Sequence, residues 1–181
     1  MNLNEKAPEG RNTMTNPDDA SVYQAPADIQ STLFIEQHRS MLAESLRGLT
    51  DEEARRRLVP SKTTLLGLVK HATFVEKVWF SEAVTGRSRA ELGLPETPGE
   101  SFDLAETDSI SSVLAAYTEA VSASRAAVAG MSGDDLLRGN RRGPLPLRWV
   151  QLHVLRELAQ HCGHADILRE QILATRPVPL P

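Results

Sequence analysis

Three histidines and one glutamate near the end of the chain have a spacing that suits a metal site. His153, Glu157, His161 and His164 all occur within the segment LRWVQLHVLRELAQHCGHADILREQI. On a helix, which turns about 100° per residue, these four side chains fall within an arc of roughly 80°. Apolar residues share that arc, so the polar groups face the core. A buried carboxylate needs a partner, and a divalent cation would provide one for Glu157 while taking neutral imidazoles as further ligands.

A second helical segment supplies a further candidate ligand. His71 lies on the apolar side of LLGLVKHATFVEKVWFSEAVTG, whereas the lysines of that segment point elsewhere. Side chains four residues apart on a helix can hold one ion, so Glu157 and His161 form a pair, and His71 from a facing helix completes a set of three. Three protein ligands leave positions for water or substrate, which indicates chemistry rather than a structural role.

The spacing alone leaves the choice of ligands open. His153 and His161 lie about 12 Å apart along a helix axis at about 1.5 Å per residue, so we do not expect both to bind one ion. His164 fits an alternative register, or a position beside the ligands or facing the substrate. A purely structural interpretation also exists, with His71 and His161 as hydrogen-bonded interior residues and Glu157 as the ion-pair partner of a nearby arginine.

The chain pattern predicts the helices that position these residues. Each of four long segments has helical periodicity or helix-forming residues, and a capping box of Thr50 and Glu53 predicts a short helix at 51–58. The irregular stretch 87–104 is long enough to cross a bundle, and a helical turn is possible near Asp134. We therefore expect an all-α four-helix bundle with a long central crossover. The long helices are predicted at about 28–47, 61–86, 108–129 and 147–174, with a flexible tail at 1–27 and a C-terminal tail at 175–181.

The composition is that of an ordinary globular domain. The chain has 181 residues, of which 40% are hydrophobic and 24% charged, and its formal net charge is −4. No segment approaches the roughly 18 consecutive apolar residues of a membrane helix. A negative chain repels a phosphate backbone. The single cysteine, Cys162, excludes an internal disulfide, and the first residues lack a secretory pattern. We therefore expect a cytoplasmic protein with no nucleic-acid or membrane partner.

One further motif lies in the turn before the last helix. Arg141 and Arg142 precede Gly143 in the segment GNRRGPLP. Two interpretations are open: the two cations contact an acidic cosubstrate, or they are the solvated charges that turns in soluble proteins often carry. No glycine-rich nucleotide-binding loop and no CxxC pattern accompanies them. The arginine pair is therefore a candidate ligand contact that depends on its surroundings.

Several of these segments together resemble a known family. The stretches GLTDEEARRR, TTLLGLVKHATFVEKVWF and LRWVQLHVLRELAQHCGHADILREQI are similar to the DinB-like superfamily, in particular its actinobacterial branch of mycothiol-dependent transferase-like proteins, related to mycothiol-dependent maleylpyruvate isomerase. The resemblance spans about residues 29–172 and is most specific in HCGHADILRE and LVKH. It implies a four-helix bundle that holds a metal through His71, Glu157 and His161, and a homodimer.

The resemblance also implies an activity. Many DinB-like proteins carry histidine where this chain has Glu157, and a carboxylate there suits zinc, with nickel or another first-row ion as alternatives. The implied function is S-transfer from mycothiol, or a similar low-molecular-weight thiol, to an electrophile. From its position one turn after His161, we expect His164 to be the catalytic residue that accepts the released proton or hydrogen-bonds the leaving group. The alternative is a non-catalytic, stress-related bundle that holds a metal or ligand. An open pocket beside the ligands favours the enzyme, and a closed site with four ligands favours the alternative.

Overall fold

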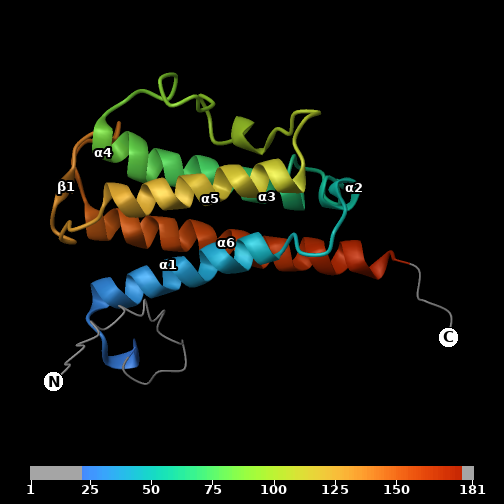
Figure 1. The fold of residues 1–181 in the computed structure, drawn as a ribbon, viewed down its shortest axis with the longest axis horizontal. Helices are drawn as coiled ribbons and strands as arrows, with labels where there is room; N and C mark the ends of the chain where they lie inside the picture. Colours follow the sequence, from blue (N-terminus) through green and yellow to red (C-terminus); the bar gives the residue numbers. More distant parts are fainter. Residues whose placement is uncertain (1–21, 177–181) are drawn as a thin grey trace, which may run out of the picture.

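The computed structural model describes residues 22–176, in which four long helical segments lie side by side (Figure 1). The prediction of an all-α fold is confirmed, since strands in the described residues are limited to the antiparallel pair β1 (Leu136–Leu137) and β2 (Leu145–Pro146). The long segments are α1 (Ala27–Glu44), a continuous run of α3 (Leu65–Glu76), η2 (Lys77–Glu82) and α4 (Ala83–Thr85), α5 (Ile110–Ala127), and α6 (Leu147–Ala174).

Side-chain caps explain where three of the helices begin. Thr50 and Glu53 form the predicted capping box at the start of α2 (Asp51–Ala54). The α3 helix begins one residue after Thr64, whose side chain accepts a hydrogen bond from the Gly67 backbone, so the predicted start at Ser61 or Thr63 is slightly early. Ser109 caps α5 in the same way. Each cap satisfies an amide that has no partner within its helix.

Two connections differ from the sequence prediction. The short helix ends at Ala54 rather than at residue 58, because the chain turns toward Pro60 directly after one helical turn. The region near Asp134 holds no helical turn; the chain instead forms the pair of two-residue strands, which begins at Leu136. Strands this short have no detectable alternation in the sequence, so the periodicity argument could not find them.

A π-helical stretch interrupts the second long helix at the level of the candidate site. In η2, three consecutive large side chains, Val78, Trp79 and Phe80, are all buried. Adjacent side chains on a helix point in different directions, so neighbouring buried residues can face different sides of the bundle. Trp79 and Phe80 therefore line two different cavities.

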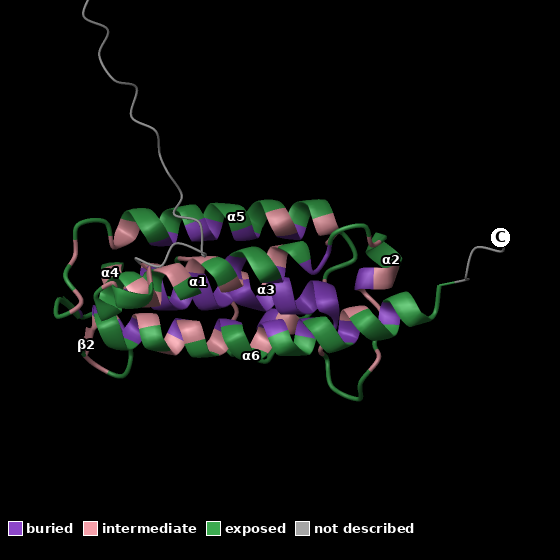
Figure 2. Cartoon of the chain, turned by 90° about the horizontal axis from the view of Figure 1, so that it is seen from below, coloured by how far each residue is buried: buried purple, intermediate pink, exposed green. Residues whose placement is uncertain are grey.

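The second long segment forms the centre of the bundle. Ten of the twelve residues of α3 are buried, and α3 packs against both α5 and α6, whereas α1 packs chiefly against α6 (Figure 2). After α4, the chain runs back outside the helices to the start of α5, as predicted for a long crossover (Figure 1). Within this crossover the short helix η3 (Glu100–Phe102) packs on α3.

The predicted tails fall largely beyond the part of the chain that the structure describes. Residues 1–21 and 177–181 lie outside it, and Val22–Gln24 form the short helix η1 directly before α1. Among the described helices, none has an apolar stretch long enough to cross a membrane. The expected homodimer stays a prediction.

Candidate metal centre

Three side chains from two helices converge in the middle of the bundle. His71 of α3 and Glu157 and His161 of α6 each offer one donor atom, and these atoms lie within 4.8 Å of one another. The His161 Nε2 atom is 3.6 Å from Glu157 Oε2, and the rings of His71 and His161 meet edge to face with centroids 4.8 Å apart. The structure thus brings together the three residues predicted as ligands.

The hydrogen bonds around His71 determine which of its ring nitrogens carries the proton. Its Nδ1 atom is 2.6 Å from the Ser101 hydroxyl oxygen, and that hydroxyl donates its only proton to the carbonyl of Pro98 at 2.5 Å. Ser101 therefore accepts a hydrogen bond from Nδ1–H, which leaves a lone pair on Nε2. Phe102 stacks on the imidazole with centroids 4.1 Å apart and holds the ring plane. The crossover thus prepares His71 to act as a ligand through Nε2.

The surroundings of His161 are the strongest indication that this site binds a cation. Both of its ring nitrogens are buried, and neither has a hydrogen-bond partner among the described residues. A buried imidazole without a hydrogen bond loses its hydration, and the Glu157 carboxylate at 3.6 Å replaces it only in part. A cation bound at one nitrogen would repay that cost, and two imidazoles with one carboxylate are a donor set that suits a divalent first-row ion.

The electrostatics keep Glu157 and His71 in the forms that bind cations. The imidazole of His161 holds the pKa of the Glu157 carboxyl at about 2, with a smaller contribution from His153, so Glu157 is ionised. Burial, with a smaller contribution from the adjacent His161 and against the opposing effect of Glu157, lowers the pKa of His71 to about 4, so His71 is neutral near pH 7. An anionic carboxylate and a neutral imidazole are the states that coordinate a metal.

The two other histidines of α6 lie outside this set. His153 is stacked on Trp149 and tilted against Trp79, and its Nδ1 accepts a hydrogen bond from Arg156 at 3.0 Å. Its Nε2 approaches the far oxygen of Glu157, at 3.8 Å. His164 is exposed, with its ring 5.8 Å from that of His161.

A cavity of about 260 Å³ opens beside the three residues. His71 and Glu157 form part of its wall, and Trp79 and Phe74 give it an aromatic side. Its remaining lining is strongly basic, with four arginines. A small molecule in this cavity would therefore contact two of the candidate ligands directly.

Sequence reasoning missed the residues that the crossover brings to the site. Ser101 and Phe102 lie in a segment that has no helical or strand periodicity, so nothing marked them as partners of His71. Cys162 lies beside His161 in the sequence and is buried. Burial raises the pKa of its thiol to about 11, which disfavours the nucleophilic thiolate at neutral pH.

Comparisons with known proteins agree with this architecture. The sequence model of a family described as mycothiol-S-transferase matches residues 31–174. A conserved protein from Enterococcus faecalis has a similar structure, with a TM-score of 0.65 and 15% identity, covering 83% of this chain and 99% of that one. A mutant of the mycothiol-dependent maleylpyruvate isomerase gives a TM-score of 0.57 and 15% identity, covering 84% of this chain and 70% of that one. A comparison with curated protein sequences finds no match.

Proposed function

This chain belongs to the mycothiol-S-transferase family, and we propose that it is a metal-dependent transferase. In this proposal the enzyme joins the sulfur of mycothiol, or of a similar low-molecular-weight thiol, to an electrophilic substrate. The observation that carries the metal dependence is the buried and unpartnered imidazole of His161 beside the carboxylate of Glu157 and the free Nε2 of His71. Family membership supports the thiol chemistry.

We propose zinc as the ion, held by His71, Glu157 and His161. A divalent cation at this position would favour the thiolate form of a bound thiol, whose ordinary pKa is near 8.5. Two imidazoles and one carboxylate from the protein leave positions open for such a ligand, as in catalytic zinc sites. Nickel or another first-row ion would serve the same donor set.

The protein residues then position the reactants and accept a proton. The cavity beside His71 and Glu157 holds the electrophile next to the sulfur, with its apolar part against Phe74 and Trp79. A new bond forms between the sulfur and the electrophilic carbon, and the leaving group departs with the electron pair of the bond that breaks. We assign the thiol proton to His164, which lies next to His161 and is exposed, so it can pass the proton to water.

The open cavity also favours an enzyme over a protein that only stores a metal. A protein that only sequesters a metal has no need of a space for a second molecule at the ligands, and a structural site is closed by a fourth protein ligand. Among the described residues, only three donors converge here, and two of them line a cavity. The arrangement therefore favours an enzyme over the non-catalytic alternative.

A thiol-consumption assay tests the proposal. Purified mycothiol and a panel of electrophiles are incubated with the protein, with the protein after chelation, and with the chelated protein after zinc is restored. We expect consumption of the thiol that disappears on chelation and returns with the ion. Equal rates before and after chelation, or no consumption with any electrophile, would refute the metal-dependent transferase.

A further inference from the structure

The positively charged wall of the cavity is not explained by thiol chemistry. Four arginines line the cavity, Arg89, Arg141, Arg142 and Arg156, whereas Glu157 is its one acidic residue. The chain as a whole has a net charge of −4, so the positive charge at this cavity is opposite in sign to that of the protein. A cavity lined by charges of one sign concentrates small ions of the opposite sign.

Two of the four arginines are already engaged by the protein. Arg89 pairs with Glu82 at 3.1 Å and covers the ring of Phe74. Arg156 donates to His153 and lies 3.4 Å from Glu157. Their charges are thus partly neutralised by acidic neighbours.

The other two arginines are available for a ligand. Among the described residues, neither the Arg141 side chain nor the Arg142 side chain forms a hydrogen bond or an ion pair. The Arg142 guanidinium lies over the ring of Trp79, 5.6 Å from its centroid, which holds it at the cavity. Both arginines occur in the connection between β1 and β2, next to Asn140.

Asn140 adds a largely buried polar side chain beside the two exposed arginines. This residue is only 6% exposed and lines the cavity. Its Oδ1 accepts the backbone N–H of Arg142 at 3.0 Å, which fixes the turn that presents the arginines. Its Nδ2 amide forms no hydrogen bond with the described residues, so the side chain keeps a donor for a ligand at the cavity wall.

We propose that Arg141, Arg142 and Asn140 bind a carboxylate of the electrophile, so that the enzyme selects anionic electrophiles over neutral ones. This inference rests on the proposed function for its reaction and adds the substrate class. Guanidinium groups bind carboxylates through two charge-assisted hydrogen bonds, and the Asn140 amide adds a third donor. The carboxylate lies at the arginine side of the cavity, and the reactive carbon faces His71 and Glu157.

A matched pair of electrophiles tests the selection. 4-(Chloromethyl)benzoate is anionic and its methyl ester is neutral, and in both a thiolate displaces chloride from the same benzylic carbon. The variant Arg141→Gln/Arg142→Gln should lower kcat/KM at least tenfold for the benzoate and less than twofold for the ester, since only the benzoate loses charge-assisted hydrogen bonds. Equal losses for both electrophiles would overturn the inference.

The thiol is the other source from which a carboxylate could come. The same variant is therefore assayed with the methyl ester and two thiols, 3-mercaptopropionate and its methyl ester. We expect the variant to slow both thiols equally. A loss confined to the anionic thiol would overturn the inference by assigning the arginines to the cosubstrate.

Binding without reaction separates this inference from the transferase activity. Trp79 and Trp149 are the two tryptophans of the chain, and both adjoin His153 at the cavity, so intrinsic fluorescence reports on its occupancy. In the chelated protein, 4-methylbenzoate should bind at least tenfold more tightly to the wild type than to the double variant. The uncharged 4-methylbenzamide should show no such difference.

Arg57→Gln is the matched control for lost charge. Arg57 is exposed and follows α2, at the end of the molecule opposite to the strands (Figure 1). It should bind 4-methylbenzoate like the wild type. If Arg57→Gln weakens binding as much as the double variant does, or if the benzoate and benzamide bind alike, the inference is wrong. A failed transfer reaction with retained benzoate selectivity would refute the proposed function and leave this anion site standing.

Discussion

At the scale of single residues, His161 and His164 have different surroundings despite being one helical turn apart. His161 is buried with both nitrogens unpartnered, whereas His164 is exposed. We expect His161→Ala to lose the metal and the activity together. His164→Ala should keep a full content of metal, measured by plasma mass spectrometry on protein purified without a histidine tag, and slow the transfer about 100-fold, since proton transfer contributes that much at the low end.

The reverse result would show that the ligands are wrongly assigned. If His164→Ala loses the ion and His161→Ala keeps it, His164 belongs among the ligands. If His164→Ala transfers as fast as the wild type, the proton goes directly to water.

The protonation of His71 should make folding sensitive to acid in the metal-free protein. Burial lowers its pKa from 6.5 to about 4, so the unfolded chain takes up a proton over a range in which the folded protein does not. The free energy of unfolding is therefore highest above pH 6.5 and falls as the pH drops toward 4. From pH 7 to pH 5 this one group should remove about 2 kcal/mol. Urea unfolding with chelator present measures it.

The variant His71→Gln isolates that contribution. Glutamine does not titrate, so the loss between pH 7 and pH 5 should shrink by about the same 2 kcal/mol, whatever the absolute stability of the variant. An unchanged loss would mean that other groups cause the acid sensitivity.

The helical repeat placed the candidate ligands on one face and left their register open, and the family resemblance narrowed them to three; neither found the groups that support them. His71, Glu157 and His161 follow the helical repeat, and helix geometry determines which side chains share a face. Ser101 and Asn140 lie in connections, where no repeat relates sequence to position. The burial of Arg39 follows the helical repeat, because this residue lies between Ile35 and Leu42 on the apolar face of α1.

At the scale of elements, the crossover holds His71 in its ligand form. Ser101→Ala removes the acceptor of the His71 Nδ1–H bond, which is buried. We expect the affinity for zinc to fall 10- to 100-fold, as is usual when the partner of a metal-binding histidine is removed, because the ring loses its fixed tautomer and orientation. Competition with a chromophoric chelator measures the affinity.

Ser122→Ala is the control for this substitution. Ser122 is an exposed serine of α5, so its removal should leave the affinity unchanged. Wild-type affinity in Ser101→Ala would show that the crossover only covers the site.

The connection that carries the arginines is packed against α4 at a glycine. A Cβ atom on Gly139 would lie 2.2 Å from the carbonyl oxygen of Glu82 and 2.5 Å from the Gly86 nitrogen, both backbone atoms. Gly139→Ala should therefore lower the free energy of unfolding by about 1–3 kcal/mol or more, through overpacking. Thermal and urea unfolding measure the loss.

A second glycine, Gly163, should give a gain in the free energy of unfolding when it is replaced by alanine. Gly163 lies inside α6, and an added Cβ there meets no atom within 4 Å. Gly163→Ala should stabilise the protein by about 0.5–1 kcal/mol, since alanine favours the helix. A Gly139→Ala protein as stable as the wild type would contradict the close packing of this connection.

The bounds of a helix were predictable where its periodic segment is long and has clear end signals. The α6 helix has the predicted bounds, 147–174, because Pro146 precedes it and prolines follow it. Helical periodicity does not distinguish the π-helical η2 from an ordinary α-helix, because residues 78–80 are all apolar and define no single stripe. Within η2, Trp79 lines the cavity beside the candidate metal centre and Phe80 lines a second cavity.

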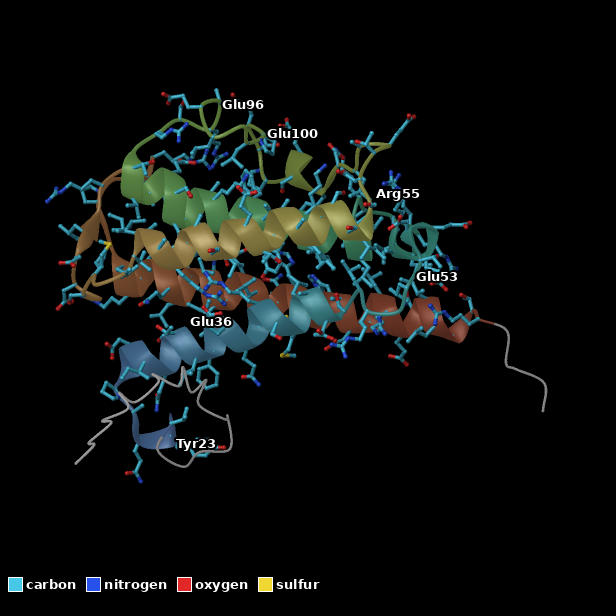
Figure 3. All side chains as sticks on the ribbon, viewed as in Figure 1. Tyr23, Glu36, Glu53, Arg55, Glu96 and Glu100 are labelled. Atoms are coloured by element: carbon cyan, nitrogen blue, oxygen red, sulfur yellow. The ribbon has the colours of Figure 1, made fainter. Side chains whose placement is uncertain are left out.

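At the scale of the whole molecule, buried charges tie α1 to the rest of the bundle. The helix packs chiefly against α6, and Arg39 extends from it to Glu76 of α3 with two hydrogen bonds of 2.8 and 2.6 Å. Glu36, labelled in Figure 3, accepts from Arg39 and also pairs with Arg125 of α5. A network of charges thus connects three helices beside the larger cavity, of about 480 Å³, which Arg39 lines.

A double-mutant cycle on the buried pair should reveal strong coupling. Arg39 is 7% exposed and Glu76 is fully buried, so Arg39→Met leaves a carboxylate in the core without its main partner. We expect a loss of about 3–5 kcal/mol in the free energy of unfolding for Arg39→Met, and a much smaller loss for Arg39→Met/Glu76→Leu, which removes both charges. The exposed pair of Arg47 and Glu44 provides the control, because Arg47→Met should cost less than about 1 kcal/mol. If the double variant loses as much as the sum of the two single variants, the pair is not coupled, and packing alone holds α1 in place.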